Sequence, residues 1–199
     1  YPNLFAEDSI PEEISKHFTY PKYLYKVQSK MIATYHDVSA DSIYRSDDIW
    51  QITPIALGTT NSKKTTSAME PTYTVCKTPD SEEEQFGLVL TYNRQSKQNI
   101  ISYLVGTCEN GVPKLSLYKF SAENNVVGIA QLNNQIEQDT TISSELEKLN
   151  TSGTKLTREI KIIPINNTLL YVEPVYQVML NDEDEIPVLK KVIVASGST

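Results

Sequence analysis

Few side chains in this sequence have the type and spacing needed for chemistry. His36 and Asp37 could act as a general base and its orienting acid, and Ser39 or Ser42 could supply a nucleophile. The members of such triads usually converge from separate segments, so their crowding in one short stretch favours a structural role. The sequence has no glycine-rich phosphate loop and no GxSxG, HExxH or CxxC motif. No catalytic residue is therefore predicted.

Glu173 is the most informative single acid, because it interrupts an otherwise apolar run of strand-forming residues. A carboxylate buried in such a strand must be paired with a cation or have a raised pKa. Arg158 and Lys161 are its candidate partners. We predict a structural ion pair between Arg158 and Glu173, which is favoured over an acid/base role for Glu173.

Carboxylates at Asp182 and Asp184 offer the hard oxygen ligands that calcium prefers. The surrounding segment lacks the central glycine and the terminal glutamate spacing of an EF-hand loop. A solvated acidic loop is therefore favoured, and no metal or other cofactor is expected. Asp182 and Asp184 remain the candidates for a calcium site.

Tyrosines and lysines gather in the first fifty residues, and the chain has 12 tyrosines against 4 phenylalanines. Tyrosine suits contact surfaces that are partly exposed to water, because its ring is apolar and its hydroxyl is polar. Lysines spaced four residues apart share one face of a helix. Such a row of lysines could contact anionic lipid headgroups or simply face solvent. The binding candidates are Tyr20, Tyr23, Tyr25, Lys22, Lys26 and Lys30.

These candidates lie on a predicted helical arm, residues 1–48. Proline at position 21 breaks one helix and opens the next. Apolar residues then recur at spacings of three and four, at Leu24, Val27, Met31 and Tyr35. This pattern predicts that the stripe is buried against the rest of the protein.

Residues 49–199 are predicted to form a mostly antiparallel sheet with an inserted helix pair at 128–149. Asn110-Gly111 is typical of a tight hairpin turn. The stretch 58–67, rich in Gly, Ser, Thr and Lys, is predicted as an exposed loop. Arm and sheet together indicate one compact α+β domain.

The carboxyl end predicts a hairpin around Asn166-Asn167, because asparagine tolerates the left-handed backbone of a tight turn. With that turn, Ile163 lies opposite Leu170, and Arg158 lies diagonal to Glu173 on the same face. The turn therefore sets the register that brings the predicted ion pair together.

Composition excludes several classes of protein. The net charge of −7 argues against a nucleic-acid surface, and no run approaches the roughly 18 apolar residues of a spanning helix. Cys76 and Cys108 are two separate thiols or a cross-strand disulfide, and both alternatives stay open. The chain begins at Tyr1 without an initiating methionine or a signal peptide, so we expect a longer polypeptide.

Several phrases occur in one order along the chain: YPNLF at 1–5, YPKYLYKVQ at 20–28, ATYH at 33–36, DDIW at 47–50, IEQD at 136–139, IIPI at 162–165, LLYVEPVY at 169–176 and LKKVIVASG at 189–197. Together they resemble the C-terminal part of uncharacterised protein family 0182, large multi-pass membrane proteins of bacteria and archaea. The resemblance runs nearly end to end and carries no assigned catalytic motif.

The resemblance implies a soluble region on the extracytoplasmic side of the cell membrane, attached through a segment absent from this chain. Together with the empty motif search, it favours a non-catalytic binding module whose partners are its own transmembrane half or other envelope proteins. The alternative is an envelope-directed hydrolase that uses Glu173 or the pair His36/Asp37 as acid and base.

Overall fold

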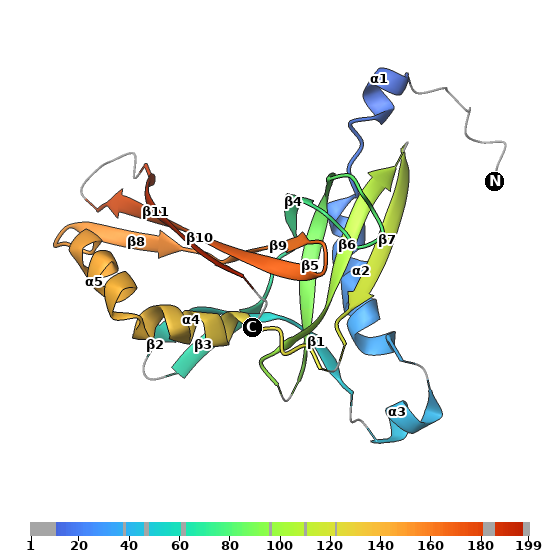
Figure 1. Ribbon diagram of the computed structural model, residues 1–199, viewed down its shortest axis with the longest axis horizontal. Helices are drawn as coiled ribbons and strands as arrows, with labels where there is room; N and C mark the ends of the chain where they lie inside the picture. Colours follow the sequence, from blue (N-terminus) through green and yellow to red (C-terminus); the bar gives the residue numbers. More distant parts are fainter. Residues whose placement is uncertain are drawn as a thin grey trace.

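The computed structural model confirms the predicted α+β class (Figure 1). It describes residues 11–37, 39–45, 48–60, 63–95, 97–109, 111–121, 123–180 and 186–196. Helix α1 spans Glu12–Ser15, α2 spans Lys22–Tyr35 and α3 spans Ala40–Arg45. The helix pair predicted late in the chain is α4 (Ile129–Gln138) and α5 (Thr140–Leu149).

The first sheet is built around β5 (Gln85–Arg94). One edge of β5 pairs with β6 (Ile100–Glu109), which pairs in turn with β7 (Val112–Lys119). The other edge pairs with β1 (Trp50–Ile52) and β4 (Thr72–Cys76), and every pair is antiparallel. The turn between β6 and β7 is confirmed, because Glu109 pairs with Val112 and Gly111 has a φ of 81°.

The second sheet is built around β10 (Thr168–Met179). One edge of β10 pairs with β11 (Val188–Ser196), and the other pairs first with β9 (Lys161–Ile165) and then with β8 (Thr154–Arg158). The predicted register is confirmed: Asn166 has a φ of 52° and Ile163 lies opposite Leu170.

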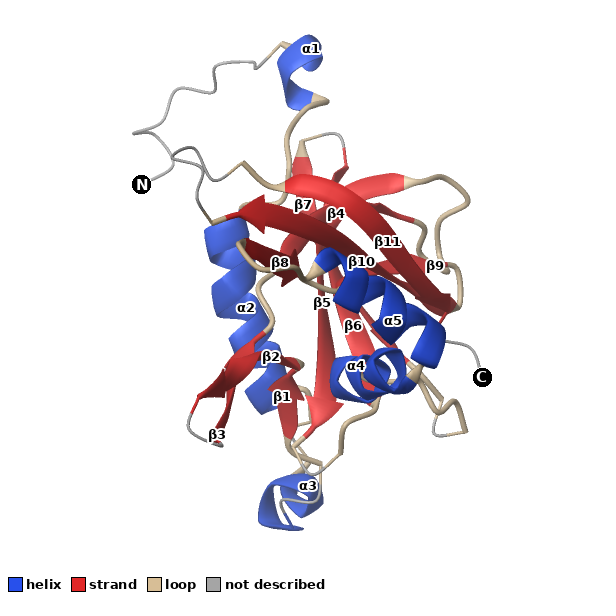
Figure 2. Cartoon of the chain, turned by 90° about the vertical axis from the view of Figure 1, so that its left-hand side faces the viewer, coloured by secondary structure: helices blue, strands red, loops and turns tan. Residues whose placement is uncertain are grey.

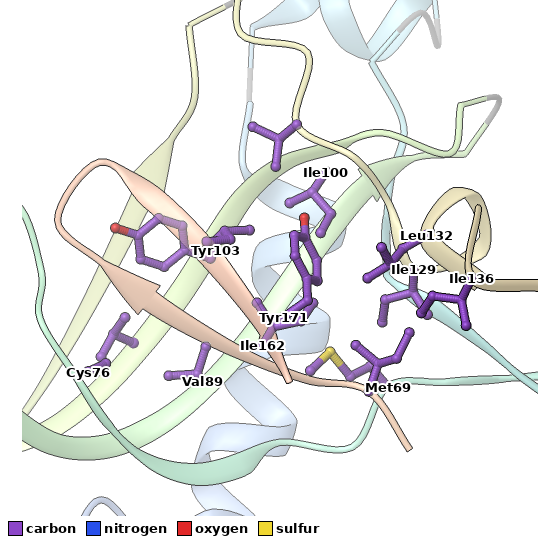
Figure 3. Close-up of a cluster of buried hydrophobic side chains, with 14 residues drawn as sticks. Met69, Cys76, Val89, Ile100, Tyr103, Ile129, Leu132, Ile136, Ile162 and Tyr171 are labelled. Atoms are coloured by element: carbon purple, nitrogen blue, oxygen red, sulfur yellow. The ribbon is translucent and has the colours of Figure 1, made fainter. Parts of the chain in front are cut away.

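Side chains from both faces of β5 are buried. Leu88 and Leu90 point to α2, where they join a cluster with Tyr25 and Trp50. Val89 points the other way, into a cluster shared with the second sheet and α4 (Figure 3). The first sheet is therefore the middle layer, and α2 and the second sheet cover its two faces.

Helix α2 packs on the sheet with a face other than the predicted one. Its buried residues are Tyr25 and Ser29, and Ile32 packs beside them. Tyr25 donates a hydrogen bond to the Leu104 carbonyl (2.7 Å), and Tyr92 donates one to the Ser29 carbonyl (2.9 Å). Because these hydrogen bonds satisfy the buried tyrosine hydroxyls, the face of α2 that carries Tyr25 can pack against the sheet. The predicted burial of Leu24, Val27, Met31 and Tyr35 is wrong.

The predicted loop at 58–67 is also wrong. Its described residues, 58–60 and 63–67, belong to β2 (Pro54–Thr60) and β3 (Lys63–Ala68), which pair antiparallel. The stretch contains four threonines, and β-branched residues favour strands. The prediction of a loop rested on the polar composition of the stretch and did not take the strand propensity of its threonines into account.

The two cysteines are free thiols. Cys76 ends β4 and Cys108 lies near the end of β6, with β5 between them. Strands two places apart are separated by roughly 9–10 Å, which is beyond the Cα separation that a disulfide spans. The disulfide alternative is therefore excluded without a rearrangement of the sheet.

We expect Cys76 to react with iodoacetamide far more slowly than Cys108 at pH 8. Burial raises the pKa of the Cys76 thiol to about 11, so little reactive thiolate is present. Peptide-resolved mass spectrometry would follow each cysteine, with the urea-unfolded chain as the reference. Cys76 should react at least about 100-fold more slowly when folded. Equal rates in the folded and unfolded chains would contradict the burial.

Candidate functional site

The exposed face of α2 is the first candidate site. Four apolar residues follow one another along it and are between 43% and 66% exposed: Leu24, Val27, Met31 and Tyr35. Tyr23, beside them, is 83% exposed. An amphipathic helix on a protein surface normally turns its apolar residues inward. Here they form a stripe that no other described element covers.

A row of lysines runs along the flank of the same helix. Lys22, Lys26 and Lys30 are four residues apart and share a face. The Lys26 ammonium contacts the carboxylate of Glu70. This hydrogen bond, together with the charges of all three lysines, holds the pKa of Glu70 below its usual value. One carboxylate thus faces three lysines, and the flank of α2 is locally positive.

Tyr20 and Tyr25 do not belong to this surface, which corrects their prediction as contact residues. Both are buried between α2 and the first sheet, where their rings meet edge to face with centroids 5.8 Å apart. The predicted contact candidates that remain on the outside are Tyr23 and the three lysines. The exposure of the apolar stripe was not predicted, because Tyr25, Ser29, Ile32 and His36 repeat at the same helical spacing and compete with it for the buried face.

The second candidate site is the buried pair of Arg158 and Glu173. Glu173 is 4% exposed, and its Oε1 lies 3.7 Å from Arg158 Nε. Glu173 Oε2 and Arg158 Nη1 are buried without a hydrogen-bond partner among the described residues. Burial raises the pKa of Glu173, the charge of Arg158 offsets part of that rise, and the charge of Glu137 adds to it. The buried carboxylate therefore has one cation beside it.

A groove of about 600 Å³ lies between α5 and β8, and Arg158 is among its lining residues. Leu146 of α5, Leu156 of β8 and Leu180 also line it, whereas Glu173 does not. A general acid or base must reach the reacting group within hydrogen-bond distance. Glu173, which contacts Arg158 of β8 and does not line the groove, is better placed to fix β8 on β10 than to meet a ligand.

Titration should report the raised pKa of the buried Glu173 carboxyl group. A folded pKa above the unfolded value contributes stability at low pH, and this contribution is lost as pH rises through the folded pKa. Relative to a Glu173→Gln variant, which cannot titrate there, the natural chain should gain stability as pH falls from 8 toward 4.5. Urea unfolding of both proteins at several pH values tests this. The other acids are common to both and cancel, so a difference that does not change with pH would contradict the raised pKa.

The His36 ring is packed into the structure. It stacks on Trp50 with centroids 3.8 Å apart, and its side chain is 4% exposed. Nδ1 lies 3.2 Å from the Ala33 carbonyl and Nε2 lies 3.4 Å from Asp48 Oδ2. Asp37, which the sequence offered as the acid that orients His36, accepts a hydrogen bond from the Ser39 amide. Both ring nitrogens face protein oxygens, so this histidine joins the end of α2 to the sheet.

Asp48 connects that histidine to the first sheet. Arg94 Nε donates to Asp48 Oδ1 at 2.7 Å. Burial acts to raise the pKa of Asp48, but the charge and hydrogen bond of Arg94 outweigh it and hold the pKa below its usual value. The ionised carboxylate therefore links His36, which follows α2, to Arg94 of β5.

Asp182 and Asp184, the calcium candidates, lie outside the described residues. Within the described part of the chain, no three His, Cys, Asp or Glu side chains are grouped closely enough to hold a metal ion. The described helices also include none with the length and apolar character needed to cross a membrane.

Comparison with known proteins supports the resemblance seen in the sequence. The profile of the Uncharacterised protein family (UPF0182) matches residues 1–149. UPF0182 proteins of Pelotomaculum thermopropionicum and Desulforamulus reducens are 35% and 33% identical, each over 99% of this chain. One from Trichodesmium erythraeum is 33% identical over 98% of the chain. No solved structure matches the chain.

The chain spans 21% of the length of each of these three relatives. The similarity therefore concerns one region of much longer proteins. Since the family profile covers well over half of the chain, and the similarity to the relatives extends through the C-terminal strands, the chain belongs to the uncharacterised protein family UPF0182.

Proposed function

We propose that this chain is a non-catalytic interaction module of a larger membrane protein, and that it rests on an anionic bilayer surface through α2. It lies on the extracytoplasmic side, attached through a segment outside this chain, as the family resemblance implies. The exposed apolar stripe of α2 carries the proposal. Helices that lie in a membrane interface bury one apolar face and keep lysines beside it.

The residue types on α2 suit such an interface. Tyr23 and Tyr35 have amphipathic rings of the kind that settle at the headgroup level. Val27 and Met31, between them, supply aliphatic surface. Burying apolar area of this kind contributes about 25 cal/mol per Å² removed from water.

Charge supports the same face. The chain as a whole carries −7, so most of its surface is repelled by anionic lipid. At α2 three lysines face one carboxylate, and charges beyond about 10 Å are largely screened. Each lysine near an anionic surface contributes about 1 kcal/mol. Electrostatics thus favours contact of α2 with an anionic bilayer.

Co-sedimentation of the purified chain with vesicles tests the proposal. Vesicles of phosphatidylglycerol and phosphatidylcholine should retain the chain, and vesicles of phosphatidylcholine alone should retain less. A Lys22→Gln/Lys30→Gln variant should bind anionic vesicles about 10- to 30-fold more weakly. A Val27→Ser/Met31→Ser variant should lose binding to both kinds of vesicle.

Val112→Ser is the matched control, because Val112 is an exposed valine on β7 and far from α2 in sequence. It should bind as the natural chain does. Circular dichroism melts would establish that all variants are folded. Equal binding of the natural chain to anionic and neutral vesicles, or binding that survives both α2 variants, would refute the proposal.

A further inference from the structure

The outer face of the second sheet is a further apolar surface. Three cross-strand pairs occupy it in succession along β10 and β11: Val172 with Val194, Pro174 with Val192, and Tyr176 with Leu189. The three β11 members are between 50% and 58% exposed, and the β10 members are half-buried. All six side chains are uncharged, and the register shifts between the second and the third pair, where Lys190 has no partner on β10. The six side chains together form the apolar patch.

The alternation along β10 shows that this patch is the uncovered side of the sheet. Leu169, Tyr171, Glu173 and Val175 are buried, and the residues between them are half-buried. On β11, Ile193 and Ala195 pack against the core, whereas Val192 and Val194 do not. An antiparallel sheet covered on one face normally presents polar residues on the other. A second apolar face indicates that something covers it.

We propose that the remaining polypeptide of the full-length protein docks on this patch. The chain spans 21% of the length of its relatives, so most of the polypeptide is available as an intramolecular partner. A stable interface between separate proteins takes roughly 20–30 residues from each partner, whereas this patch has six side chains. A covalently attached partner has a high effective concentration, so a smaller patch suffices.

Two other occupants fit less well. A second copy of the chain would bring together two molecules that each carry −7. A bilayer that contacts α2 cannot also cover this patch, because α2 and the second sheet pack on opposite faces of the first sheet. Figure 1 shows α2 and the β10–β11 ribbon on either side of β5 and β6, and Figure 2 shows the molecule from the side of the ribbon.

Cysteine accessibility in the full-length protein tests this docking. Val194→Cys and, as control, Val112→Cys are each placed in the isolated chain and in the full-length protein, and labelling is followed by peptide-resolved mass spectrometry. Both valines are exposed in the chain. Val194→Cys should be labelled at least about tenfold more slowly in the full-length protein, the protection that about 1.4 kcal/mol of docking gives. Val112→Cys should react equally in both.

Equal labelling of Val194→Cys in the two proteins would overturn the proposal. Protection that is already present in the isolated chain and grows with its concentration would assign the patch to a second copy. Protection of the full-length protein in bilayers but not in detergent would assign it to lipid. Either result also overturns the proposal. Adding Val27→Ser/Met31→Ser should leave the protection unchanged, so this test and the vesicle test fail independently.

Discussion

Replacing Arg158 by methionine is expected to lower the free energy of unfolding by about 3–5 kcal/mol, because the variant leaves Glu173 as a buried charge without a counterion. Glu173 Oε1 has its cation 3.7 Å away, and Oε2 has no hydrogen-bond partner among the described residues. Methionine fills much of the volume of the arginine stem, so lost packing contributes little. Urea unfolding at pH 7 measures the change.

Two further variants separate the charge from the packing. Lys161→Met removes a neighbouring cation on β9 whose partner, Glu159, lies 2.7 Å away and is largely exposed, so it should cost about 0–1 kcal/mol. The double variant Arg158→Met/Glu173→Leu removes both buried charges and should recover most of the lost stability. A single variant as stable as the natural chain, or a double variant worse than the single one, would show that the pair does not hold β8 on β10.

The C-terminal sheet shows how far local sequence can determine a structure. A tight turn at Asn166 fixes the pairing of Ile163 with Leu170, and the same register continues past β9 to place Arg158 opposite Val175. Side chains alternate along a strand, so the turn also decides which residues share the face of Glu173. The ion-pair geometry could therefore be predicted from spacing alone, since each step depends on neighbouring residues.

The orientation of α2 could not be predicted in that way. Two sets of residues have helical spacing, and the choice between them depends on partners far away in sequence. Tyr25 can be buried because its hydroxyl donates a hydrogen bond to the Leu104 carbonyl, 79 residues along the chain. The spacing of apolar side chains does not show whether a buried tyrosine hydroxyl will have a hydrogen-bond acceptor. The exposed stripe, and with it the proposed membrane surface, becomes visible only when the sheet is in place.

Replacing Tyr25 by alanine is expected to lower the free energy of unfolding by about 3–5 kcal/mol, the usual cost of removing a buried aromatic ring. The ring is fully buried, meets Tyr20 edge to face, and lies so close to Gly106 that a Cβ there would come within 2.8 Å of it. Little can move into the space left by the ring, because one wall is sheet backbone. Thermal or urea unfolding measures the effect.

Tyr25→Phe separates the hydroxyl from the ring and should cost about 0.5–1.5 kcal/mol, the net contribution of one hydrogen bond. Tyr23→Ala is the matched control two residues away, on the exposed side of the same helix, and should change stability by less than about 0.5 kcal/mol. If instead Tyr23→Ala were the costly variant and Tyr25→Ala the mild one, α2 would be rotated about its axis. The stripe would then face the sheet, and neither its exposure nor its contact with lipid would stand.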